Sequence, residues 1–111
     1  MKLIKIKELG IEVQDGYDQR NIKLQDIKIP EGMRLLTLSE LLHIYNKYQK
    51  KFKNLEIIDE AIQNPIDKYR EERPAWTLWF YGLDGRSGLG GYDRLYYILS
   101  VRGVRFCKEI K

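Results

Sequence analysis

The chain has almost none of the residue types that carry metal and nucleophile chemistry. Its 111 residues include one cysteine, Cys107, and one histidine, His43. A lone cysteine excludes an internal disulfide and favours a reducing compartment. A nucleophilic Cys107 would need His43 as its base, whereas its place after Phe106 in an apolar run is typical of a structural thiol. We therefore expect no metal, no cofactor and no catalysis.

Long apolar runs are also missing. No segment approaches the roughly 18 apolar residues that a membrane-spanning helix needs. The opening "MKLIKIKELG" carries a charge at every second or third position, which is typical neither of a signal peptide nor of a span. We expect a soluble, cytoplasmic protein, with a place in a virion left open. Abundant isoleucine, lysine and tyrosine beside scarce cysteine and histidine suit an AT-rich or hyperthermophilic genome, archaeal viruses included.

The charge excess is modest, at 20 basic against 16 acidic residues and a net charge of +4. A dedicated nucleic-acid binder often has a stronger bias, although a local basic face stays open. With 43% hydrophobic and 32% charged residues, the composition is that of an ordinary globular protein. Residues 1–111 are expected to form a single domain with one core.

The middle of the chain carries the strongest local signal. The sequence "TLSE", Thr37 to Glu40, is a capping box, and apolar residues recur behind it at helical spacing. We predict a helix over 38–52. A second helix is predicted over 55–63, because it would end before the Asn64–Pro65 pair, and a further short turn over 66–73.

Strands are predicted on both sides of these helices. The first segment should break at Gly10, and the turn residues 15–21 include Asn21, which tolerates positive φ. A strand after it should change face at a bulge near Asp26. The fold class is therefore α+β, with two helices in the middle and a small antiparallel sheet. The predicted strands cover 2–14, 22–29, 75–81, 95–101 and 104–110.

Two segments resemble a known family. "IPEGMRLLTLSELLHIYNKY" is similar to the helix-opening motif of C-type lectin-like domains of the formylglycine-generating-enzyme and bacterial Lcl-like types, in which a threonine caps the first helix as Thr37 would. "YYILSVRGVRF" resembles their closing strand through residues 102–106. The chain departs from these motifs at Met33, Leu36 and Gly103.

The resemblance implies paired terminal strands, two helices and a β-hairpin that carries a loop. It implies binding more often than catalysis. The paired cysteines of copper-binding members and the calcium-dependent sugar-binding motifs are both missing, so the resemblance implies no metal here.

The insert "GLDGRSGLGG" between two aromatic runs is the most unusual stretch. It lacks the lysine and the following helix of a phosphate loop, and its two nearby carboxylates are few for calcium. It is either a plain hairpin connection or a recognition loop over 82–94 for a protein or glycan partner. The candidate ligand-binding residues are Trp79, Tyr81, Asp84, Arg86, Tyr92 and Arg94. A homo-oligomer is also plausible, because aromatic, β-rich domains often bury surface between copies.

A basic helix face offers an alternative from another class. The lysines and the one histidine on this face could contact the phosphates along a nucleic-acid backbone, although such a face is more often simply solvated. The alternative function is a small nucleic-acid-binding protein, with His43, Lys47, Lys50, Lys51, Arg102 and Arg105 as the contacts.

Overall fold

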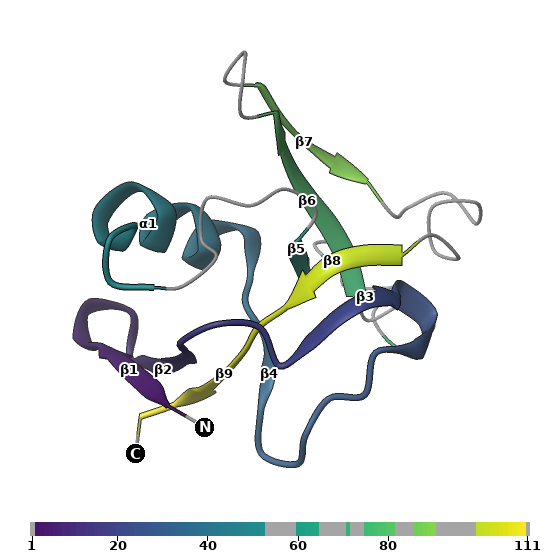
Figure 1. Ribbon diagram of the computed structural model, residues 1–111. Helices are drawn as coiled ribbons and strands as arrows, with labels where there is room; N and C mark the ends of the chain where they lie inside the picture. Colours follow the sequence, from purple (N-terminus) through teal and green to yellow (C-terminus); the bar gives the residue numbers. More distant parts are fainter. Residues whose placement is uncertain are drawn as a thin grey trace.

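The computed structural model describes residues 2–52, 60–64, 71, 75–81, 86–90 and 100–110 (Figure 1). Its elements in chain order are β1 (Leu3–Ile6), the 3-10 helix η1 (Lys7–Leu9), β2 (Ile11–Gln14), β3 (Gln19–Lys23), the 3-10 helix η2 (Leu24–Asp26), β4 (Arg34–Leu35), α1 (Leu38–Tyr48), β5 (Glu60–Gln63), β6 (Ala75–Tyr81), β7 (Arg86–Gly90), β8 (Ser100–Val104) and β9 (Phe106–Glu109).

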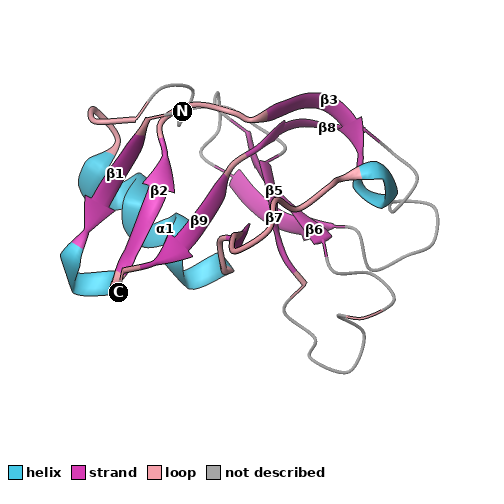
Figure 2. Ribbon diagram, turned by 90° about the horizontal axis from the view of Figure 1, so that it is seen from below, coloured by secondary structure: helices cyan, strands magenta, loops and turns pink. Residues whose placement is uncertain are grey.

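The strands form two sheets that lie side by side in both ribbon views (Figures 1 and 2). The first sheet has the order β1-β2-β9-β4, and the second has the order β3-β8-β5-β6-β7. Neighbouring strands are antiparallel except β5 and β8, which meet in parallel at Glu60 and Gly103. The α+β class with antiparallel pairing is confirmed, with two small sheets where one was predicted.

The N-terminal hairpin confirms the predicted break. Gly10 takes the left-handed conformation, with φ of 67°, and its N–H closes η1 on the carbonyl of Lys7. Glycine adopts positive φ without the steric penalty that a side chain would add. The C-terminal strand β9 then pairs with β2, where Val13 faces Cys107. The two terminal strands β1 and β9 are therefore separated by β2 and do not pair directly.

Helix α1 begins at the predicted capping box. The Glu40 N–H donates to Thr37 Oγ1 at 3.2 Å, and the Thr37 N–H donates to Glu40 Oε1 at 2.9 Å. The helix ends at Tyr48, four residues before the predicted end, and residues 49–52 continue as a turn and a bend. Leu41 and Ile44 are fully buried against the first sheet.

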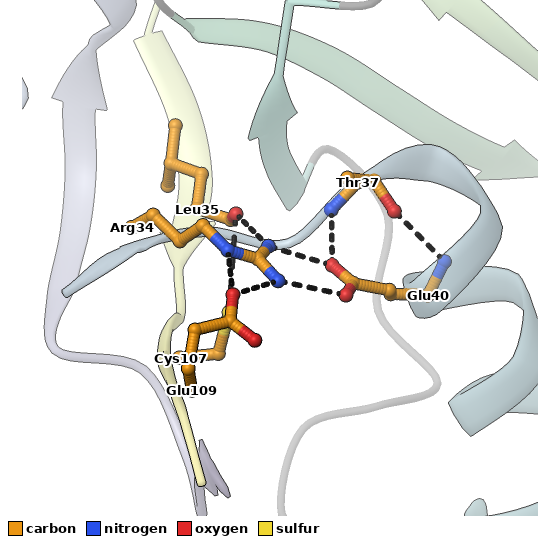
Figure 3. Close-up of polar contacts among 6 residues, drawn as sticks. All are labelled: Arg34, Leu35, Thr37, Glu40, Cys107 and Glu109. Atoms are coloured by element: carbon orange, nitrogen blue, oxygen red, sulfur yellow. Dashed lines mark hydrogen bonds and ion pairs between the residues drawn. The ribbon is translucent and has the colours of Figure 1, made fainter. Parts of the chain in front are cut away.

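Arg34 links the capping box to the first sheet, as Figure 3 shows. Its guanidinium donates to both carboxylate oxygens of Glu40, at 2.7 and 2.9 Å, and its Nε donates to Glu109 Oε1 at 2.9 Å. Burial alone would raise the pKa of Glu40, but the hydrogen bonds from Arg34 and Thr37 outweigh burial and hold that pKa below its ordinary value. The helix start is thereby fixed to β4 and β9 by charge-assisted bonds.

Two apolar clusters form the core. The first packs α1 and Phe52 on the first sheet, through residues such as Ile11 and Val13. The second fills the space between the sheets with Leu35, Phe106 and Val104. Two adjacent residues of β9 therefore pack in different clusters: Phe106 belongs to the second cluster and Cys107 to the first. Successive side chains of a strand point to opposite faces, which explains this division.

The predicted second helix is wrong over residues 60–63. These residues form β5, between β8 and β6, and Ala61 and Ile62 are both fully buried in different clusters. Burial on both faces of a central strand overrides a helical pattern. Residues 55–59 of that prediction, and the predicted turn over 66–73 apart from Glu71, lie outside the described residues.

The predicted strand over 22–29 is also shifted. The strand β3 begins at Gln19, inside the predicted turn, and ends at Lys23, after which η2 replaces the predicted bulge near Asp26. The expectation for Asn21 is confirmed, since its φ is 50°. Of the strand predicted over 95–101, only Ser100 and Val101 are described, and they open β8.

A buried ion pair joins the two sheets. Arg105 is the single residue between β8 and β9, and its Nε donates to Glu60 Oε1 at 2.8 Å while both side chains are almost fully buried. Its Nη1 donates to the carbonyl of Gln14, at the end of β2, at 3.2 Å. The guanidinium carbon lies 5.1 Å from the centroid of Tyr17 and 5.5 Å from that of Phe52. One side chain thus contacts both sheets and the segment after α1.

We predict a pH-dependent cost for Glu40→Gln. At pH 7 the variant should lose about 1 kcal/mol of unfolding free energy, because a carboxylate bonded to Arg34 and Thr37 becomes a neutral amide. The folded pKa of Glu40 lies below the unfolded one, so its stabilisation is complete above the unfolded pKa and is lost as pH falls through the folded pKa. The difference between wild type and variant, measured by urea unfolding across pH, should therefore shrink on acidification. Glu31→Gln, at an exposed turn position, is the control and should change little. A difference that stays constant with pH would contradict this account of the helix start.

Candidate functional site

The hairpin of β6 and β7 is the most protruding part of the second sheet (Figure 1). Five residues of each strand are paired, from Thr77 opposite Gly90 to Tyr81 opposite Arg86. On its other side β6 pairs with β5 only as far as Leu78. In the part of the chain that the structure describes, residues 79–81 therefore pair with β7 alone. We call residues 77–81 with 86–90 the β6–β7 ribbon.

The register of the β6–β7 ribbon brings three predicted site residues together. Tyr81 is opposite Arg86, and Trp79, two residues earlier, is opposite Gly88. Residues directly opposite in an antiparallel pair, and those two apart along a strand, share one face of the sheet. Trp79, Tyr81 and Arg86 therefore lie on one face. Gly88 and Gly90 lie on that face too and contribute no side chain to it.

The same register corrects the interpretation of the glycine-rich insert. Residues 82–94 were predicted to be a loop, whereas Arg86–Gly90 form β7 and pair along their whole length. Glycine weakens a strand but does not prevent pairing when a neighbouring strand supplies the hydrogen bonds. Asp84, Tyr92 and Arg94, the other predicted ligand-binding residues, lie outside the described residues.

The predicted basic face, which α1 and the turn after it carry, is partly neutralised. Lys50 and Lys51 are exposed, but Lys47 Nζ lies 3.3 Å from Glu8 Oε2. His43 is half-buried, and its Nε2 is a buried atom without a hydrogen-bond partner among the described residues. The predicted members of this face therefore do not act as one uniform cationic surface.

Glu8 also fixes an aromatic ring on this face. The Tyr48 hydroxyl donates to Glu8 Oε1 at 2.6 Å, and this bond lowers the pKa of Glu8 and raises that of Tyr48. Lys51 Nζ lies 5.3 Å from the Tyr48 ring centroid, within the range of a cation–π contact. The contact of η1 with the end of α1 explains the position of these side chains without a ligand.

The predicted arginines occupy different environments. Arg105 is completely buried and bonded to Glu60, so its guanidinium does not reach the surface where a phosphate backbone would lie. Arg102 lies on β8. Sequence reasoning placed Arg105 among surface cations, although its neighbours Val104 and Phe106 form an apolar run that was a signal for burial.

Cys107 has the environment of a structural thiol. It is fully buried, and burial raises the pKa of its thiol to about 12. Its Sγ donates to the carbonyl of Leu35 at 3.9 Å (Figure 3). The thiolate is the reactive form, and it is scarcely populated at neutral pH with such a pKa. Among the described residues, no cluster of three or more histidine, cysteine, aspartate or glutamate side chains could hold a metal ion.

The first sheet carries a groove that sequence reasoning missed. Its volume is about 810 Å³, and β1, β2, the turn at 31–33 and the C-terminal residues line it, with Leu3, Met33 and Ile110 as apolar members. Lys108 and Glu12, opposite each other on β9 and β2, form an ion pair within its lining, with 3.6 Å between Nζ and Oε2. The lining residues are far apart in the chain, so no local pattern could reveal the groove. No helix among the described residues is long and apolar enough to cross a membrane.

We predict that Cys107 is unreactive in the folded protein. An aryl disulfide reagent such as dithiobis(2-nitrobenzoate), which releases a coloured thiolate on exchange, should modify it at least about a hundredfold more slowly than in urea-unfolded protein, because burial and a high pKa both suppress the thiolate. Absorbance at pH 7 measures the rate. The control is Ser39→Cys in a Cys107→Ala background, which places a thiol at an exposed helix position and should react quickly. Comparable rates in folded and unfolded protein would show that the site opens.

Comparison with known proteins adds no relative, since no protein-family model, no curated protein and no solved structure matches this chain.

Proposed function

We propose that this protein is a non-catalytic binding module that recognises a protein or glycan partner through the β6–β7 ribbon and residues 82–94. The observation that carries the proposal is the pairing register, with Trp79, Tyr81 and Arg86 on one face beside Gly88 and Gly90. Tryptophan, tyrosine and arginine are the residues that most often dominate binding energy at interfaces. Glycine lets a ligand approach the backbone closely.

The resemblance to C-type lectin-like domains supports the same role. It rests on the helix opening at Thr37, whose capping box is formed, and on the sequence of residues 102–106, which spans the end of β8 and the start of β9. Within that resemblance binding is the usual activity. The described residues also give no support to a cysteine–histidine pair, since Cys107 bonds to a carbonyl and His43 Nε2 has no hydrogen-bond partner.

We predict that each of two substitutions on the β6–β7 ribbon weakens recognition. Immobilised wild type should retain a defined protein from a host lysate or a defined sugar on a glycan array. Trp79→Ala and Arg86→Ala should each weaken that retention about tenfold or more, because interface anchors typically contribute over 1 kcal/mol. Melting temperature, measured by circular dichroism, should change little for Arg86→Ala. Lys50→Ala, at an exposed position of the turn after α1, is the control and should retain the partner.

Two results would count against the proposal. Unchanged retention by both variants would show that this face is not the binding surface. Binding to a single-stranded oligonucleotide that weakens steeply with added salt, and that Lys50→Ala reduces while Arg86→Ala does not, would favour the nucleic-acid alternative on α1 and the turn after it.

A further inference from the structure

The two sheets have four edge strands among the described residues: β1 and β4 in the first, β3 and β7 in the second. An edge strand leaves backbone N–H and C=O groups unpaired on its outer side. Soluble proteins usually protect such edges by shortness, by charged side chains or by distortion of the backbone. The four edges of this protein differ in that protection.

Three edges carry recognisable protection. The strand β4 has two residues. In β1, which has four, Lys5 is exposed and the flanking Lys2 and Lys7 are exposed as well. In β3 the pairing with β8 skips Asn21, whose φ of 50° distorts the strand, and the residues on either side of it include two exposed cations, Arg20 and Lys23.

The strand β7 carries none of these devices along most of its length. Its five residues, "RSGLG", pair with β6 without interruption, and only the first is charged. It contains no proline, which would block a further strand, and its two glycines leave the backbone accessible. The hairpin projects from the body of the molecule, so neither α1 nor the first sheet stands beside it (Figure 1).

We propose that β7 pairs antiparallel with β7 of a second copy of this chain, about a two-fold axis through Gly88, and so joins the two second sheets into one. The sequence of β7 is self-complementary in this register. Arg86 of one copy is opposite Gly90 of the other, and Ser87 is opposite Leu89. No like charges face each other, which removes the usual penalty on edge-to-edge pairing. The result is an isologous dimer, the commonest oligomer of soluble proteins.

The dimer extends what the β6–β7 ribbon can do. The faces that carry Trp79 and Tyr81 in the two copies belong to one continuous sheet, so two recognition faces lie together. A partner with repeated epitopes then binds both, and the effective concentration of the second site raises the overall affinity. The pairing itself uses backbone groups and does not depend on the proposed recognition of a partner.

The two-fold register makes a specific test available, because residue 88 faces itself. Sedimentation velocity of the wild type over about 1–500 µM should show a concentration-dependent dimer, as expected of a short interface. Gly88→Lys and Gly88→Glu should each raise the dimer dissociation constant about tenfold or more, because like charges are then opposed at the axis. An equimolar mixture of the two variants should dimerise again, since opposite charges are then paired.

The control is Gln25→Lys, which adds the same charge at an exposed position of η2 and should dimerise like the wild type. Circular dichroism checks that each variant is folded. A wild type that stays monomeric at the highest concentration would overturn the proposal. So would a dimer that tolerates the same charge at position 88 in both copies, or a mixture of the Lys and Glu variants that remains monomeric.

Discussion

The buried charge of Arg105 is the constraint on which the arrangement of the two sheets depends. The C-terminal strand segment leaves the second sheet at Val104 and enters the first at Phe106, and Arg105 is the residue between them. A guanidinium cannot lose its charge in a protein, so every element around it must supply an acceptor or an aromatic face. Glu60, the carbonyl of Gln14 and the rings of Tyr17 and Phe52 do so.

The surroundings of Arg105 extend this constraint. The Phe106 N–H donates to Gln14 Oε1 at 2.9 Å, which ties the start of β9 to the end of β2. The Tyr17 ring lies directly against Gly103, where a Cβ would collide with it. Glycine at 103 therefore lets the ring reach the guanidinium. Burial raises the pKa of Glu60 against the opposing charge of Arg105, so the ionised pair carries a desolvation cost. We infer that the ion pair contributes to the fold by specifying a unique arrangement of the two sheets.

The features that the sequence predicted correctly are those that depend on local chemistry. The capping box at Thr37 and Glu40, the strand break at Gly10 and the tolerance of Asn21 for positive φ each depend on neighbours within a few positions, and each prediction is confirmed. The helix predicted over residues 60–63 is wrong because their conformation is decided by pairing with β6 and β8, which are distant in the chain. The same holds for the candidate site. The alternation of side chains along a strand over 75–81 is enough to place Trp79 and Tyr81 on one face, but only the pairing of β6 with β7 adds Arg86 to that face.

The most direct test of this account is a double-mutant cycle on Glu60→Gln and Arg105→Met, read as unfolding free energy in urea. Glu60→Gln leaves the guanidinium buried without its counter-charge and should cost about 3–5 kcal/mol. The double variant should be more stable than the sum of the single effects allows, because the neutral pair no longer buries a charge. Single losses below about 1 kcal/mol that simply add in the double variant would show that Arg105 and Glu60 do not hold the two sheets together.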